Sequence, residues 1–273
     1  MSDFPHIPLY HIDHLVAEGG TARVYFGIDL RSGFPVAVKE LKIRHLSDPT
    51  IRGKFRQVET QLYLYMRHPN IPRLIDFLDI NGQLYIIMEY IDGVDLEHYI
   101  YGDIGLIPED RALPIFLKVL DTVSYLHKNG VLHLDIKSNN VMLLPGDNIK
   151  LIDLGIASRI SDAGNTTGYG TPAYMPPEQT EKGMCGPYTD IFALGILLFE
   201  MLTGRLPFEG ESKKEIAYKI KNSPTPQMKE TYPYINPELQ RIVEHALAKE
   251  PPMRFQTCDE FKNEIIRYMR KMR

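Results

Sequence analysis

The sequence of 273 residues is short of three things: cysteine, net charge and long apolar runs. Its two cysteines, Cys185 and Cys258, are too few for a disulfide framework, which favours a reducing compartment such as the cytoplasm. A formal net charge of −4 argues against nucleic acid as the main partner. The N-terminus carries the early Asp3 and no apolar core, so it lacks the features of a secretory signal.

The most apolar window runs from Ile191 to Gly204 and is interrupted by Glu200. A membrane-spanning helix needs about 20 apolar residues, so this window predicts a buried core helix and no membrane span in this chain. The basic end, RYMRKMR, predicts a solvated helix terminus, because cations suit the C-terminal end of a helix dipole. The alternative is the cytosolic edge of a longer membrane protein.

What the sequence does contain is enough apolar material, 44% of residues, for a sizeable core. Alternation within residues 16–41 predicts three antiparallel strands, and two more are expected at 73–79 and 83–90, joined by an Asn-Gly turn. Between them a helix should begin at Asp48, with Pro49 in its first position. Its apolar residues at helical spacing are Ile51, Phe55, Val58, Leu62 and Tyr65.

After residue 92 the patterns become helical. Helices are predicted at 108–130, with Pro114 inside, at 187–203, and near 212–221, 237–248 and 257–270. Strands followed by helices indicate an α+β protein with two lobes. We expect one domain over 1–273: an N-lobe over 1–88 with one long helix, a hinge at 89–93 and a mainly helical C-lobe over 94–273. The chain has no internal repeat and no low-complexity tract.

Lys39 and Glu59 are a candidate ion pair. Lys39 ends the apolar run VAVK in a predicted strand, and Glu59 shares the face of its predicted helix with Phe55 and Leu62. A charge on an inward face is costly unless an opposite charge meets it. Each residue alone is more often an ordinary surface charge. Because both are expected on inward faces of neighbouring elements, the sequence predicts that they form an ion pair.

The stretch HLDIKSNN, residues 133–140, places Asp135, Lys137 and Asn140 in one polar turn after an apolar run. A second acidic residue, Asp153, ends the predicted strand IKLIDLG before a glycine. Asn140 and Asp153 offer the hard oxygen ligands that magnesium prefers, with phosphates completing the shell. Asp135 would then accept the proton of a hydroxyl, with Lys137 beside a moving phosphoryl group. Read singly, each motif is no more than a turn.

Taken in order, these motifs resemble those of the eukaryotic-type (Hanks-type) serine/threonine protein kinase catalytic domain, over nearly the whole chain. The matching motifs are VAVK, Glu59, HLDIKSNN, DLG, and PPE at 176–178. Lys137, Thr171 and the segment GTPAYMPPE are similar to the serine/threonine class. EGGTARVY, PPEQ and ALAKEPPMRFQT are similar to such kinases from bacteria.

The resemblance implies a bilobal kinase fold and transfer of the γ-phosphate of ATP to Ser/Thr hydroxyls of protein substrates. It implies Mg²⁺, or Mn²⁺ in its place, held by Asn140 and Asp153. Catalysis is assigned to Asp135, Lys137, Lys39 and Glu59. The implied nucleotide-binding residues are Val16, Ala17, Gly19, Gly20, Val24, Ala37, Lys39, Met88, Glu89, Ile91, Asp95, Asn140, Met142 and Asp153. Arg254 is expected to pair with Glu178, and two copies could pair through the N-lobe.

Five residues depart from the family pattern, of which Leu154, for phenylalanine, is a mild apolar change and Pro177, for alanine, is not expected to matter. Leu134 stands where many relatives carry an arginine that meets a phosphate on the activation segment, so activity should not depend on that contact. Ala17 and Ala22 replace glycines of the phosphate-covering loop, which matters wherever a positive φ is needed.

The sequence also leaves two other functions to consider, a pseudokinase and a small-molecule kinase. A pseudokinase, binding nucleotide without transfer, is disfavoured because the set of charged residues is intact. A small-molecule kinase is disfavoured by the complete segment 170–178, since a small acceptor needs no peptide platform. His133 is expected to be structural, and the cysteines to be lone thiols.

Overall fold

The structure is a computed structural model that describes residues 4–53, 55–56, 66–154, 158–159, 170–180 and 184–272. The chain divides into two compact units, Met1–Asp92 and Gly93–Arg273. Within the described ranges, no helix combines the length and the apolar character that a membrane crossing requires.

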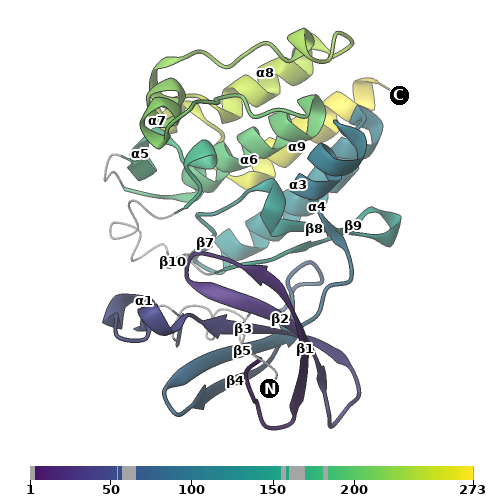
Figure 1. Cartoon of the computed structure of the whole chain (residues 1–273). Coiled ribbons are helices and arrows are strands. Elements are labelled where there is room, and N and C mark those ends of the chain that lie inside the picture. Colours follow the sequence, from purple (N-terminus) through teal and green to yellow (C-terminus); the bar gives the residue numbers. More distant parts are fainter. Residues whose placement is uncertain are drawn as a thin grey trace. The chain divides into compact units, whose positions relative to one another are not determined.

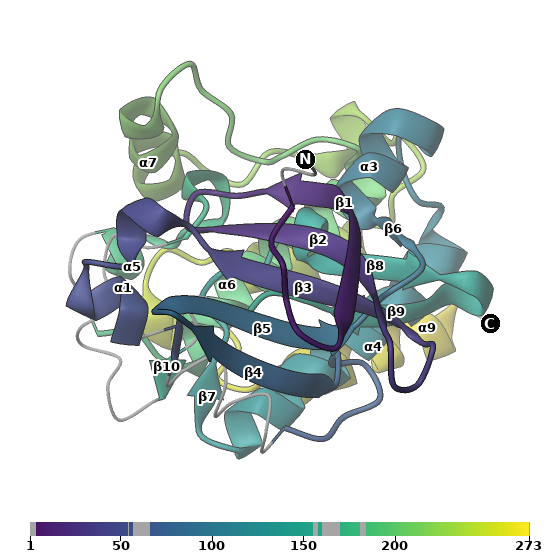
Figure 2. The same cartoon turned by 60° about the horizontal axis from the view of Figure 1, so that its bottom comes forward.

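The first unit is built on one antiparallel five-stranded sheet, in the order β1-β2-β3-β5-β4 (Figures 1 and 2). All five predicted strands are present, although β1 begins earlier than expected. The strands are β1 (Tyr10–Glu18), β2 (Ala22–Asp29), β3 (Pro35–Leu41), β4 (Leu74–Ile80) and β5 (Gln83–Glu89). Asn81 and Gly82 turn the chain between β4 and β5 with φ values of 52° and 86°, and this pair of positive angles suits the twist of a two-residue hairpin.

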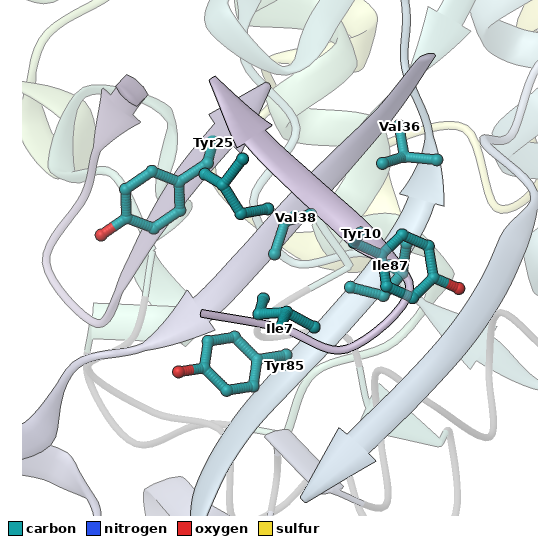
Figure 3. Close-up of a cluster of buried hydrophobic side chains, with 8 residues drawn as sticks. Ile7, Tyr10, Tyr25, Val36, Val38, Tyr85 and Ile87 are labelled. Atoms are coloured by element: carbon teal, nitrogen blue, oxygen red, sulfur yellow. The ribbon is translucent and has the colours of Figure 1, made fainter. Parts of the chain in front are cut away.

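One face of this sheet is covered by the residues that precede β1 and by the start of β1 itself. Ile7 and Tyr10 pack on Val38, Ile87 and Tyr85, and Figure 3 shows these side chains gathered on the same side of the strands. The alternation of β2 places Tyr25 in this cluster, so Val24, Phe26 and Ile28 lie on the opposite, less buried face. The cluster that contains Ile7 and Tyr10 therefore does not cover this opposite face.

The predicted helix after β3 begins where expected. α1 (Pro49–Gly53) starts behind Asp48, whose Oδ1 accepts a hydrogen bond of 3.2 Å from the amide of Ile51. Ile51 and Phe55 pack with Leu84 in a second apolar cluster. Before α1 lies the short 3₁₀ turn η1 (Ile43–His45). Val58, Glu59, Leu62 and Tyr65 lie outside the described residues.

The second unit is mainly helical, as predicted. Its α-helices are α3 (Leu96–His98), α4 (Glu109–Lys128), α5 (Pro177–Thr180), α6 (Pro187–Thr203), α7 (Lys213–Asn222), α8 (Pro237–Ala246) and α9 (Cys258–Lys271). A π-helical turn, η3 (Tyr99–Ile104), follows α3. The 3₁₀ turns are η4 (Ser138–Asn140), η5 (Pro145–Asp147), η7 (Pro172–Tyr174), η8 (Met228–Glu230) and η9 (Pro251–Met253). The short strands are β6 (Val94–Asp95), β7 (Val131–Leu132), β8 (Val141–Leu144), β9 (Asn148–Leu151) and β10 (Ser158–Arg159).

Helix α6 is the centre of this unit, and nearly every one of its residues is buried. It packs on α4 and α8, while α9 packs on α4 and α8 in turn (Figure 1). A Cβ at Gly195 would lie 2.9 Å from Ala246 Cβ, so this glycine permits the close approach of α6 and α8. Helix α4 continues through Pro114 and ends before Gly130, which has a φ of 74°.

Candidate active site

The turn at 133–137 is held by one buried carboxylate from α6. Asp190 accepts hydrogen bonds of 2.8 Å from the amides of both His133 and Leu134, and a third of 2.8 Å from Nε2 of His127. Burial alone would raise the pKa of Asp190, but these donors outweigh it and the net pKa lies below its ordinary value. Leu134 is thereby kept at a φ of 65°, which a side chain with a Cβ adopts only where its surroundings enforce it.

Four side chains meet at this turn: those of Asp135, Lys137, Asn140 and Thr171. Oδ1 of Asp135 accepts hydrogen bonds from the amide of Thr171 at 3.0 Å and from its hydroxyl at 2.9 Å. Oδ2 of Asp135 lies 3.1 Å from Nζ of Lys137 and 3.2 Å from Nδ2 of Asn140. Lys137 also donates to the Thr171 hydroxyl at 3.0 Å. The sequence prediction that Asp135, Lys137 and Asn140 gather in one turn agrees with this geometry, and Thr171 joins them from 34 residues beyond Lys137.

This arrangement fixes the carboxylate of Asp135 in one orientation. Both oxygens have donors, yet the side chain keeps 14% of its surface exposed, and that of Lys137 keeps 22%. A carboxylate that is oriented by its neighbours and still reaches solvent can accept a proton from an incoming hydroxyl. The ammonium beside it can offset negative charge on a reacting group.

Asn140 and Asp153 could hold a hard cation. The side-chain Nδ2 of Asn140 donates a hydrogen bond of 2.8 Å to the carbonyl of Asp135. The side-chain oxygen is therefore the atom that Asn140 can offer to a metal. Its main chain accepts a bond of 2.8 Å from the amide of Ile152, which ties η4 to the residue before Asp153. Among the described residues no group of three or more His, Cys, Asp or Glu side chains is arranged as a metal site. A cation here would thus depend on these two oxygens and on phosphate oxygens, a donor set that fits Mg²⁺.

In the first unit, the strand register aligns several predicted nucleotide-binding residues. Val24 of β2 lies opposite Ala17 on one side and Lys39 on the other, and Ala37 lies opposite Met88. Residues directly opposite on neighbouring strands point to the same face. Lys39 is buried on this face. Its expected pairing with Glu59 falls on a residue that the structure does not describe.

The glycine turn between β1 and β2 needs no positive φ. Gly19 closes it by donating its amide to the carbonyl of Ala22 at 2.9 Å. The positions with positive φ include neither Gly19 and Gly20 nor Ala17 and Ala22. The conformational cost that the sequence suggested for alanine in this loop is therefore not incurred in this structure.

Two of the remaining predicted nucleotide contacts, Glu89 and Asp95, have local partners. Glu89 donates its amide to the carbonyl of Arg73 at 2.9 Å, so a contact of its main chain with adenine would use its carbonyl. Asp95 caps α3 by accepting from the amide of His98 at 2.8 Å, and lies opposite Met142 in the β6–β8 pair. Val16 lies at a register irregularity of β1 and is about half exposed. Ile91 lies between the last residue of β5 and the end of the first unit.

A buried network beneath the turn was missed at the level of the sequence. Glu200, in the last turn of α6, accepts a hydrogen bond of 2.9 Å from Ser138 Oγ and another from the hydroxyl of Tyr174. The hydroxyls of Ser138 and Tyr174 lie 3.1 Å apart. The signal was present: a glutamate inside an otherwise apolar helix needs polar partners. The expected pairing of Arg254 with Glu178 is present, with an N–O distance of 2.7 Å.

A family model described as the protein kinase domain matches residues 10–265. The chain belongs to this family. Its kinase relatives include the serine/threonine-protein kinase PrkC of Bacillus subtilis, 35% identical over 259 residues. PknB of Mycolicibacterium smegmatis, also a serine/threonine-protein kinase by name, is 34% identical over 268 residues. Each match covers 94% of this chain but only 40% of PrkC and 42% of PknB, so the kinase chain spans about two fifths of these relatives.

A kinase domain acts on ATP and a protein substrate with the help of divalent metal. The α+β architecture expected from the sequence, with a strand-rich first part and a helical second part, is confirmed.

Proposed function

We propose that this chain transfers the γ-phosphoryl group of ATP to serine and threonine hydroxyls of protein substrates. The observation that carries the proposal is the set of bonds around Asp135, whose Oδ1 is held by Thr171 and whose Oδ2 is held by Lys137 and Asn140. Thr171 supports the serine/threonine class, because its hydroxyl connects the proton acceptor to the segment that a peptide substrate would follow. The names of the relatives point to the same class.

In the proposed reaction, the substrate oxygen attacks the γ-phosphorus in line with the leaving β–γ bridging oxygen. The O–P bond to the substrate forms as the bridging P–O bond breaks, ADP leaves with that electron pair, and Asp135 accepts the hydroxyl proton. Lys137 offsets charge on the transferring group. Asn140 and Asp153 would hold Mg²⁺, which supplies charge neutralisation of the phosphates when bound. Turnover for such enzymes is about 1–100 per second.

The nucleotide contacts assigned from the family resemblance belong to the same proposal. Lys39, with Glu59 as its partner, would contact the phosphates, and the main chain of Glu89 and Ile91 would contact the adenine. Asp95 would reach the ribose. The aligned row of Ala17, Val24 and Lys39 in the sheet supports a shared task for these residues. The two units over 1–273 would then act as one catalytic domain.

The test is transfer of radiolabelled phosphate from ATP to a generic basic protein with Mg²⁺ present. Asp135→Asn should lower transfer by at least a hundred-fold while the variant still binds nucleotide. Asp103→Asn, which changes an exposed carboxylate of the same unit, is the matched control and should retain activity. Phosphoamino-acid analysis of the product should show phosphoserine and phosphothreonine.

Two outcomes would overturn the proposal. Equal transfer by the wild type and Asp135→Asn would show that the label arises elsewhere. Binding of ATP with no transfer that depends on Asp135 would identify the chain as a pseudokinase. Pairing of two copies through the first unit and a cytoplasmic location remain predictions, which light scattering and cell fractionation would test.

A further inference from the structure

The tip of the β1–β2 hairpin is contacted by a basic segment that follows β3. Arg44 Nη2 lies 2.5 Å from the carbonyl oxygen of Gly20, and His45 Nε2 lies 3.2 Å from the same oxygen. Arg44 and His45 are 24 and 25 residues away from Gly20 in the sequence. The contacts therefore join the glycine turn to a separate element, η1.

A second set of contacts joins the same two segments. The amide of Lys42 donates to the carbonyl of Thr21 at 2.9 Å. Its ammonium lies 2.7 Å from Glu18, whose carboxylate also lies 3.3 Å from Nε of Arg23. Lys42 is thus bonded to Glu18 before the two glycines and to Thr21 after them, and Arg44 contacts the tip at Gly20.

The chemistry at His45 assigns separate tasks to the two side chains. Arg44 Nε lies 3.1 Å from His45 Nε2, and an arginine nitrogen can only donate. One ring nitrogen cannot accept from Arg44 and donate to Gly20 at once, so it is the tautomer with its proton on Nδ1 that lets His45 brace the guanidinium. Arg44 then supplies the hydrogen bond to the Gly20 carbonyl.

Within the turn, one hydrogen bond from the amide of Gly19 to the carbonyl of Ala22 closes the loop, whereas the carbonyl of Gly20 is contacted from η1. A Cβ built at Gly20 meets no atom within 4 Å, and neither glycine has a positive φ. Glycine loses more backbone entropy on ordering than any other residue, so the Gly19–Gly20 pair is intrinsically mobile. A charge-assisted hydrogen bond to its carbonyl opposes that mobility.

We infer that Arg44, braced by His45, is a positioning residue that holds the glycine turn ready for the phosphates of ATP. This inference rests on the proposed function, because the turn is taken as the phosphate-covering loop. An ordered loop loses less entropy when the nucleotide binds, so Arg44 should strengthen ATP binding and leave the chemical step nearly unchanged.

The test compares Arg44→Gln with the wild type in two measurements. In the nucleotide-free protein, amide hydrogen exchange of residues 17–23 should become faster in the variant. In the kinase assay, KM for ATP should rise about two- to ten-fold, as expected for loss of one exposed charge-assisted bond, with kcat within two-fold. Arg44→Lys, which keeps a donor but cannot be braced in the same way, should give an intermediate KM.

The matched control is Arg52→Gln. Arg52 also donates to a hairpin carbonyl, that of Gly82, at 3.2 Å, but at the β4–β5 turn. It should leave both the exchange of residues 17–23 and KM unchanged. Unchanged exchange in Arg44→Gln overturns the inference whatever the activity, and faster exchange with an unchanged KM overturns the positioning role. Failure of the proposed function would be seen separately, as a wild type that transfers no phosphate.

Discussion

The guanidinium of Arg254 donates two parallel hydrogen bonds to the carboxylate of Glu178, at 2.7 and 2.9 Å. Arg254 also donates to the carbonyls of Tyr188, Ala248 and Lys249, and its side chain has no exposed surface. A lysine cannot reproduce this planar pattern and would leave a buried carboxylate poorly matched. We expect Arg254→Lys to lower the free energy of unfolding by about 3 kcal/mol, measured by urea denaturation.

The control for this prediction is Arg267→Lys. Arg267 pairs with Glu264 at 2.8 Å, but its side chain is 62% exposed. An exposed pair contributes about 0–1 kcal/mol, so this change should be nearly neutral. If both variants lose similar free energy of unfolding, burial and the five hydrogen bonds of Arg254 do not determine how much it stabilises the fold.

Leu134 leads to a prediction about regulation. The side chain packs with Leu132 and Cys185 in a buried apolar cluster and offers no charge to a phosphate. The side chains of Thr171 and Gln179 instead tie their own segment to the turn at 133–137. Thr171 bonds Asp135, and Gln179 Nε2 donates to the carbonyl of Leu134 at 3.2 Å. Ser161, Thr166 and Thr167 lie outside the described residues, and replacing all three by alanine should leave kcat/KM within a few-fold.

Phosphate-transfer assays on protein produced with and without a phosphatase would check this. A loss of twenty-fold or more in the triple variant, or on dephosphorylation, would show that a phosphate is required after all. Leu134→Arg is the complementary variant. It should destabilise the protein, because it places a charge in the apolar cluster.

Much of this fold is encoded in local patterns, and the rest depends on contacts between distant residues. The apolar run of α6 and the Asn81–Gly82 turn specify their elements directly, since periodicity and turn chemistry are local properties. The spacing within 133–140 likewise predicts that Asp135, Lys137 and Asn140 lie together in one turn. By contrast, Ser138 meets Glu200 across 62 positions, and no local pattern encodes that pairing. The conformation of Ala17 was equally inaccessible, because φ depends on how the hairpin is held.

Glu200 should make stability depend on pH. Burial raises the pKa of its carboxyl, and the hydroxyls of Tyr174, Ser138 and Tyr101 only partly oppose this. The folded state therefore binds a proton more tightly than the unfolded state does, and the free energy of unfolding falls as pH rises above the ordinary carboxyl pKa of about 4.3. Glu200→Gln cannot titrate. Its stability relative to the wild type should therefore improve as pH rises through this window and then level off.

Denaturation of both proteins between pH 4 and pH 7 measures this difference. Glu264→Gln, which removes a carboxylate that is 34% exposed, is the control for the loss of one negative charge. A constant difference between Glu200→Gln and the wild type would mean that Glu200 titrates alike in both states.

Lys249 should show the opposite dependence on pH. Its ammonium is buried, contacts the ring of Phe208 at 4.1 Å, and has no hydrogen-bond partner among the described residues. Burial, with the nearby charge of Arg254, lowers its pKa to about 8. The folded state therefore favours the neutral amine. The free energy of unfolding rises as pH increases from about 8 towards the ordinary pKa of lysine. Below about pH 8 the ammonium form is present in the folded state, and its burial lowers stability.

Replacing Lys249 by methionine keeps the length of the side chain and removes the charge. The gain should be about 1 kcal/mol at pH 7, a figure discounted for the partial exposure of the side chain, and should shrink as pH approaches 10. Lys213→Met, at an exposed lysine, is the control for the same change of side chain outside the apolar surroundings. Thermal denaturation between pH 7 and pH 10 decides the matter. If the methionine variant is less stable at pH 7, the attraction between the ammonium and the ring of Phe208 exceeds the cost of burying the charge.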